Sequence, residues 1–454
     1  MVRGQESSCP RKHSSPLAEV HTARFFDPAN ILLERTGQHP GMELETQKWN
    51  ILIHWLESRG MRIPTGGLAV EYREFEGSGR GLAVTRDVGP DEVLFSIPES
   101  CLINVDTLFK WAKRHKATGL TATQLLCLFL ALFKSNLLDV AEDYAPYLDS
   151  LPETFRDHPL TVVVLHRQYK GQLPVEVAQK VDKIHVRFMS DVEKIQNIFP
   201  SVPIEAYLWG WLNVNTRSLY YSCKRAKSHQ DNITLCPLLD FANHSFSATN
   251  FNSSYYRKNG HPIPTMLAPA KGLQAGEQLF LLYGFHSNPT LFTEYGFTDE
   301  HAPKEIQIDQ AIEDLFQRDD EGKEKRELLE SHGYWGDWTL HLDPPPVSPS
   351  YRLNPTLSLL QIHLKDNEQL RQWQQVLAGY AERVSVDNSR RSASTLREIC
   401  TVYKIQAESH LGHVQDNENE APIFDLRSTR RLWLEQLEIT TLMLDALLSK
   451  QDGL

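Results

Sequence analysis

Short strand-like segments occur in two separate parts of this 454-residue chain, and a helical stretch lies between them. Residues 66–105 and 217–283 alternate brief Val, Leu and Phe runs with Gly, Pro and Asp turns, which predicts several short β-strands in each part. Apolar residues recur at helical spacing in 121–138 and 204–216. The pattern therefore predicts an α+β fold in which helices are inserted into a domain of small β-sheets.

The two ends of the chain differ from this middle part. Residues 1–44 are polar and show little periodicity, so we interpret them as a disordered tail. A chain of 454 residues exceeds one ordinary hydrophobic core, which indicates two domains or one elaborated domain. We assign a first domain to 45–300, with its helical insert at about 121–205, and a second domain to 305–454.

The second domain is expected to be helical. Asn354 followed by Pro355 predicts a helix N-terminus, because Asn accepts hydrogen bonds from free backbone N–H groups and Pro suits the first helical position. Thr395 and Glu398 have the spacing of a capping box and predict another helix start. The acidic, helical pattern of 305–454 therefore predicts an all-α domain.

Charge and cysteine content narrow the class of protein. A net charge of −11 argues against a nucleic-acid partner, because such binding needs clustered basic side chains. The six cysteines are scattered, which favours a reducing compartment, cytoplasmic or nuclear, over a disulfide or zinc scaffold. The longest apolar run, 125–133, is too short to span a bilayer, and the first residues lack an apolar signal region. We expect a soluble monomer with no membrane partner.

The stretch PLLDFANHS (237–245) places a carboxylate, an amide and an imidazole directly after apolar residues. A metal site needs three or four converging ligands, and Asp240 and His244 have no second His, Asp or Glu cluster at suitable spacing. A serine hydrolase needs a nucleophile elbow, and no GxSxG occurs. Two interpretations of this stretch remain. Asp240 and Asn243 could stabilise a turn, or the stretch could bind a cofactor.

Further motifs have both a structural and a functional interpretation. GSGRGL (77–82) precedes a strand-like segment rather than a helix, so it is not a dinucleotide loop; it is either a tight turn or a close backbone approach to a small ligand. Arg217 has a purely structural interpretation, in which its positive charge stabilises the C-terminus of its own helix. Tyr283, followed by glycine at a strand end, suits donation of a hydrogen bond to a reacting group, whereas Tyr295 and Phe297 are aromatics that could belong to the core.

Taken in order, G-S-G-R-G-L, N-x-N-T-R, L-x-D-x-x-N-H-S and L-Y-G followed by G-F resemble the motifs of SET-domain methyltransferases. The class is the one named for the Rubisco large-subunit lysine methyltransferase, and WGWLNVNTR is most similar to its SET-domain-containing-protein-4 subgroup. The resemblance covers about 66–300, and beyond 305 only length and helical character agree. It implies a SET domain with a pseudoknot, S-adenosylmethionine as cofactor, and a C-terminal domain that holds a protein substrate.

The resemblance also implies which residues bind the cofactor. Asn243 and His244 are expected to bind its adenine and amino-acid parts, with Arg217 near its carboxylate and Phe297 covering it. The 77–82 loop is expected to lie alongside. One short segment is expected to contact S-adenosylmethionine largely through its backbone: Glu92, Val93 and Leu94.

The same resemblance implies the substrate side of the site. Tyr283 is expected at the methyl-transfer channel as the catalytic residue, also in contact with the cofactor, while Arg217, Asp240 and Leu219 face the substrate. The apolar Leu219 favours lysine over histidine, because an imidazole acceptor would be helped by a polar partner. We expect a lysine-bearing protein substrate, histone or non-histone, and no metal. Protein-histidine methylation and a non-catalytic SET module remain alternatives.

Overall fold

A computed structural model describes residues 40–137, 143–166, 171–248, 263–413 and 424–449. The chain divides into two compact units, 1–47 and 48–454, and apart from the first residues of a helix that begins at Pro40 the features below belong to the second. Of the predicted disordered tail, 1–44, residues 1–39 lie outside the described residues and residues 40–44 are helical. Within the described ranges, no helix is both long enough and apolar enough to cross a membrane.

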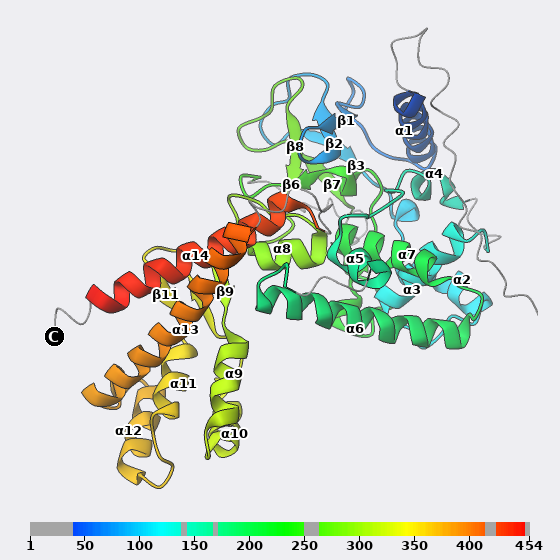
Figure 1. Ribbon diagram of the computed structural model, residues 1–454. Helices are drawn as coiled ribbons and strands as arrows, with labels where there is room; N and C mark the ends of the chain where they lie inside the picture. The colour runs from blue at the N-terminus through cyan, green and yellow to red at the C-terminus, as the bar shows by residue number, and fades with distance from the viewer. Residues whose placement is uncertain (1–39, 138–142, 167–170, 249–262, 414–423, 450–454) are drawn as a thin grey trace, which may run out of the picture. The chain divides into compact units, whose positions relative to one another are not determined.

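Small sheets built from strands far apart in the sequence form the β part of the first domain (Figure 1). The largest has the order β1 (Val70–Phe75), β2 (Gly79–Val84), β8 (Gln278–Leu281) and β6 (Asn243–His244). Two smaller sheets join β3 (Val93–Ser96) to β7 (Thr265–Leu267) and β4 (Leu219–Tyr220) to β5 (Ile233–Thr234). β2 pairs antiparallel with β8, and β6 runs parallel to β8. Strands before the helical segment therefore pair with strands after it, as the interrupted β pattern predicts.

Helices make up most of the remaining first domain. They are α1 (Pro40–Ser58), α2 (Phe109–Arg114), α3 (Ala122–Lys134), α4 (Ala145–Leu148), α5 (Pro159–His166), α6 (Val175–Ile198), α7 (Ile204–Arg217) and α8 (Asn288–Tyr295). Thr121 and Gln124 form a capping box at the start of α3. The residues of α3 from Gln124 to Leu132 are all buried, so this helix is enclosed on all sides and not only on the face that the apolar spacing predicted.

The close packing of α3 against α7 depends on Gly210. A Cβ at this position would lie 2.6 Å from the backbone oxygen of Cys127 and 3.2 Å from the backbone nitrogen of Ala131. Only a residue without a side chain lets the two helix backbones approach this closely. Because α7 ends at Arg217, this contact also positions the backbone from which that side chain extends.

The C-terminal part contains α9 (Asp309–Arg318), α10 (Gly322–His332), α11 (Leu353–Leu360), α12 (Asn367–Leu377), α13 (Val386–His413) and α14 (Leu426–Ser449). Figure 1 shows α13 and α14 side by side, and they pack against each other extensively. In addition to these helices, a small sheet has the order β11 (Ser348–Pro349), β10 (Thr339–His341), β9 (Glu305–Gln307). The sequence pattern did not indicate this sheet.

Two predicted helix starts in this part are wrong. α13 begins at Val386, where Ser385 Oγ accepts a hydrogen bond from the Asn388 backbone N–H at 3.0 Å. Thr395 therefore lies inside the helix, and its hydroxyl donates back to the Arg391 carbonyl at 3.2 Å instead of capping a terminus. α11 begins at Leu353, so Asn354 is likewise a helical residue.

Hydrophobic residues form two main clusters. One extends from Leu52 to Leu281 and the other from Ile306 to Met443, so each part of the chain buries its own core. A third, smaller cluster combines Val177 of α6 with residues of α8 and α14. The last helix of the chain therefore packs against elements of the first domain.

Candidate active site

The ends of β6 and β8 bring several of the sequence-predicted site residues together. His244 in β6 pairs with Leu281 in β8, two positions before Tyr283. A 3-10 helix, Leu239–Phe241, precedes β6 by one residue, and Leu238 and Leu239 at its start are fully buried. Leu238 has φ +69°, an unfavourable conformation for a bulky residue, so surrounding packing must hold this turn. Apolar burial thus presents Asp240, Asn243 and His244 from one short segment.

Asp240 lies at the centre of a buried network. Its Oδ2 atom accepts a hydrogen bond from the Tyr147 hydroxyl at 2.8 Å and lies 3.4 Å from Arg217 Nη1. Arg217 Nη1 also donates to the Asp240 carbonyl at 2.9 Å. Burial raises the pKa of Asp240, while Arg217 and Tyr147 oppose that rise. Asp240 therefore orients Arg217, and no group of His, Cys, Asp or Glu side chains among the described residues could hold a metal ion.

Asn243 lies against the glycine-rich segment 77–82, which was expected to be a loop but whose residues from Gly79 onward belong to strand β2. Its Nδ2 donates to the Ser78 carbonyl at 3.3 Å. A Cβ at Gly81 would lie 2.8 Å from that Nδ2 and 2.7 Å from Gln278 Nε2. The absence of a side chain at Gly81 leaves room for these two amides, and the 77–82 segment therefore belongs to the same site as Asn243.

His244 has one ring nitrogen engaged and the other free of protein partners. Nδ1 accepts a hydrogen bond from the Tyr283 backbone N–H at 3.1 Å, which places the ring proton on Nε2. Nε2 is buried and has no hydrogen-bond partner within the described ranges. Burial lowers the pKa of His244, with Asp299 opposing the change, so the ring is neutral near pH 7. A buried, unsatisfied N–H of this kind is suited to a bound ligand.

The Tyr283 hydroxyl, for which the sequence suggested donation to a reacting group, makes a hydrogen bond within the protein. It donates its proton to the Ala242 carbonyl at 3.0 Å, so its lone pairs are what it can offer a reacting group. Burial raises the pKa of Tyr283 to about 12, opposed by Arg217, so the phenol stays protonated at neutral pH.

Aromatic rings lie next to the Tyr283 ring. The ring centroid of His244 lies 5.2 Å from that of Tyr283 and 6.0 Å from that of Phe297. Tyr295, at the end of α8, lies 5.2 Å from Tyr283 and 6.2 Å from Phe297. Gly296 ends α8 in the left-handed conformation, φ +84°, and so turns Phe297 back towards this group. Tyr295 was not among the predicted site residues; the aromatics on either side of a helix-ending glycine were the signal available for it.

Other predicted residues lie apart from this group. The side chain of Glu92 is held by Arg86 at 2.6 Å and by the Gly89 N–H at 3.0 Å, and its carbonyl accepts from the Ala268 N–H. Leu94 is fully buried, and Val93 pairs with Leu267. Leu219 is half-buried in β4. No hydrogen bond, ion pair or ring contact in the described parts of the chain joins these four predicted residues to His244 or Tyr283, and their assignment stays a prediction.

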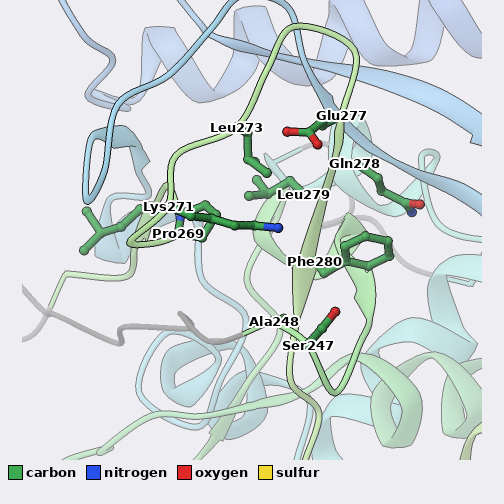
Figure 2. Close-up of a pocket in the computed structure, with 10 residues that line it drawn as sticks. Ser247, Ala248, Pro269, Lys271, Leu273, Glu277, Gln278, Leu279 and Phe280 are labelled. Atoms are coloured by element: carbon green, nitrogen blue, oxygen red, sulfur yellow. The ribbon is translucent and has the colours of Figure 1, made fainter. Parts of the chain in front are cut away.

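A cavity of about 200 Å³ lies against the other end of β8 (Figure 2). It is lined by Gln278, Leu279 and Phe280 of that strand and by the connection that contains Pro269 and Lys271. Gln278 is the residue it shares with the Gly81 neighbourhood, whereas Asn243, His244 and Tyr283 do not line it. The cavity is therefore a neighbour of the aromatic group and not its interior.

Comparison with solved structures supports the fold, and comparison with relatives of similar sequence then defines the family. The SET domain of Rubisco LSMT bound to lysine and AdoHcy superposes with a TM-score of 0.62 at 16% identity, covering 89% of this chain and 92% of that one. No protein-family model matches the chain. The ribosomal lysine N-methyltransferase set11 of Schizosaccharomyces pombe is 30% identical over 315 residues, 66% of this chain and 76% of the relative. Human SET domain-containing protein 4 is 28% identical over 429 residues, 88% of this chain and 91% of the relative.

The chain belongs to the SET-domain protein-lysine N-methyltransferases and is an enzyme that uses S-adenosylmethionine. The described residues fit that cofactor for two reasons. His244 has a buried N–H without a partner among them, and Gly81, which has no side chain, allows the Asn243 amide to lie close to the β2 backbone. The relatives support lysine as the acceptor, and the match to the actin-histidine N-methyltransferase of Rhinolophus ferrumequinum, 23% identical over 356 residues, is weaker.

Proposed function

We propose that Arg217, Asn243, His244, Tyr283 and Phe297 form the site where this enzyme binds S-adenosylmethionine and methylates a lysine of a protein. The observation that carries the assignment is the neutral His244 ring, whose buried Nε2–H has no partner in the described part of the chain. Arg217, His244 and Phe297 come from three separate parts of the sequence. If the 237–245 stretch were only a turn, it would not need Arg217 and Phe297 beside it.

S-adenosylmethionine supplies a methyl group bonded to a positively charged sulfur, and its transfer to an amine is an in-line displacement. Alignment of the acceptor nitrogen is therefore the main task of the protein. The Tyr283 hydroxyl oxygen, with its own proton committed to Ala242, accepts a hydrogen bond from a lysine amine and so fixes the direction of the nitrogen lone pair. Transfer requires this amine to be neutral, and a buried aromatic surrounding favours the uncharged form.

The Arg217–Asp240–Tyr147 network is proposed to hold Arg217 in place for contact with the cofactor. A guanidinium is suited to hold a carboxylate, and its Nη1 is fixed here by two oxygens of Asp240. Arg217 Nε is buried and has no hydrogen-bond partner among the residues described. The network presents a rigid positive group while Asp240 limits its net charge.

We further propose a ribosomal protein as the first substrate class to test, because the relative from Schizosaccharomyces pombe is named for ribosomal lysines. The C-terminal part, which has its own hydrophobic core, is proposed to hold that substrate. A cytoplasmic or nuclear location is proposed from the five described cysteines, all of which are buried and free.

The decisive experiment is transfer of a radiolabelled methyl group from S-adenosylmethionine into ribosomes and into whole-cell extract, followed by mass spectrometry of the labelled protein. We expect label on a lysine side chain with the wild-type enzyme. Tyr283→Phe should lower turnover about a hundredfold while calorimetric binding of S-adenosylmethionine changes little, since the lost contact is made to the acceptor amine. Full turnover in Tyr283→Phe would refute the role given to its hydroxyl.

A further inference from the structure

Asn288, the first residue of α8, is fully buried and its side-chain amide makes three hydrogen bonds. Nδ2 donates to the Asp299 carbonyl at 2.8 Å, and Oδ1 accepts from the Asp299 backbone N–H at 2.7 Å. Nδ2 also donates to Glu435 Oε1 at 2.6 Å. One amide therefore fixes both backbone groups of Asp299 and links them to the last helix of the chain.

This arrangement holds Phe297 between two fixed points. On one side, Tyr295 ends α8 and packs against Tyr283. On the other side, Asp299 is fixed to Asn288, so the short segment Gly296–Thr298 is anchored at both ends. The direction in which Phe297 faces the His244 ring, 6.0 Å away, depends on both anchors.

One face of α14 supports the second anchor. Ser428 Oγ accepts from the Thr298 hydroxyl at 3.3 Å, and Glu438 pairs with Lys304 at 2.9 Å. Glu435 lies between these residues on the same helix face and is 5% exposed. A helix that begins more than a hundred residues after Phe297 thus contacts the segment that carries it.

We propose that Asn288 is a positioning residue for methyl transfer: with Glu435 of α14 it clasps Asp299 and thereby sets Phe297 over the cofactor. The C-terminal helix is then part of the machinery that shapes the cofactor site, in addition to any contact with substrate. This inference rests on the proposed cofactor-covering role of Phe297.

The test uses the full chain and two measurements that need no protein substrate. Hydrogen exchange of the peptide that contains the Asp299 amide reports the clasp directly, and calorimetric titration with S-adenosylmethionine reports its effect. We expect Asn288→Ala to accelerate exchange in that peptide and to weaken cofactor binding about tenfold, with Glu435→Ala acting in the same direction. Glu435→Gln keeps an acceptor for Asn288 Nδ2 and should restore both properties.

Gln436→Ala is the matched control, because it removes a buried hydrogen bond of α14 to the Tyr403 carbonyl, 2.8 Å, and leaves Asn288 untouched. It should alter neither readout by more than about twofold. If Phe297→Ala weakens binding but Asn288→Ala and Glu435→Ala do not, the clasp is refuted. If Phe297→Ala itself binds S-adenosylmethionine like wild type, the proposed role of Phe297 fails, and the positioning of the cofactor through Asn288 fails with it.

Discussion

Glu435 should make the stability of this protein depend on pH. Burial raises the pKa of its carboxyl from 4.5 to about 7, while Asn288, Lys304 and Arg431 oppose the rise and Glu438 adds to it. A group whose pKa is raised on folding stabilises the folded state fully below its unfolded pKa, and this contribution is lost as pH rises through the folded pKa. For Glu435 the loss falls between about pH 4.5 and 7.

The size of the effect follows from the shift. At about 1.4 kcal/mol per pKa unit, the rise from 4.5 to about 7 corresponds to roughly 3 kcal/mol. Glu435→Gln removes the titration and keeps the shape and an acceptor oxygen. We therefore expect the free energy of unfolding of Glu435→Gln, relative to wild type, to increase by roughly 3 kcal/mol between pH 4.5 and pH 8.

Urea unfolding of both proteins across this range measures the difference. Glu438→Gln, one turn along the same helix, is the control: Glu438 pairs with Lys304 at a partly exposed position, so its removal should change stability by less than about 1 kcal/mol at every pH. A Glu435→Gln difference that stays flat from pH 4.5 to pH 8 would refute the burial argument for this carboxyl.

Three further variants test other features. Gly81→Ala should weaken S-adenosylmethionine binding with little change in melting temperature, because the new Cβ meets the side-chain amides of Asn243 and Gln278 and the ring of Phe75 but no backbone atom; unchanged affinity in calorimetry would contradict the placement of the 77–82 segment. Gly210→Ala should lower stability by about 1–3 kcal/mol in urea unfolding, since its Cβ meets the Cys127 backbone, and Gly412→Ala, with no atom within 4 Å, is its control. Asp240→Asn should cost about 1–3 kcal/mol and lower turnover, because Arg217 loses its charged partner; wild-type stability and turnover would count against the network.

The sequence predicted local features of this fold better than the contacts that assemble it. Alternation and turn residues indicated β1, β2 and β3, and the buried apolar run indicated α3. The three-stranded sheet of the C-terminal part was not predicted, because its strands have two or three residues each, too few for periodicity. The capping-box spacing at Thr395 misplaced the start of α13, since the same spacing occurs by chance on a helix interior.

The candidate site shows the same division. Asp240, Asn243 and His244 lie in one stretch, so their proximity could be inferred from the sequence, and the resemblance added Arg217, Tyr283 and Phe297. Tyr295 was read as a core residue, because a helical aromatic gives no local sign of the ring it will face. Asn288 and Glu435 are 147 residues apart, and no spacing rule connects them.

The pairing of Leu82 in β2 with Leu279 in β8 has a consequence for how this protein is made. The whole chain between Leu82 and Leu279 must be closed into a loop before these two strands meet. This step is slow, because the entropy cost of closing the loop comes before any strand contact is gained. During synthesis, β8 does not yet exist when β1, β2 and the inserted helices have left the ribosome, so β2 lacks one of its two neighbours until residue 281 has followed. An unpaired strand edge favours aggregation. Fragments that end before β8 should therefore require chaperones, and the first domain completes its folding only after most of the chain has been translated.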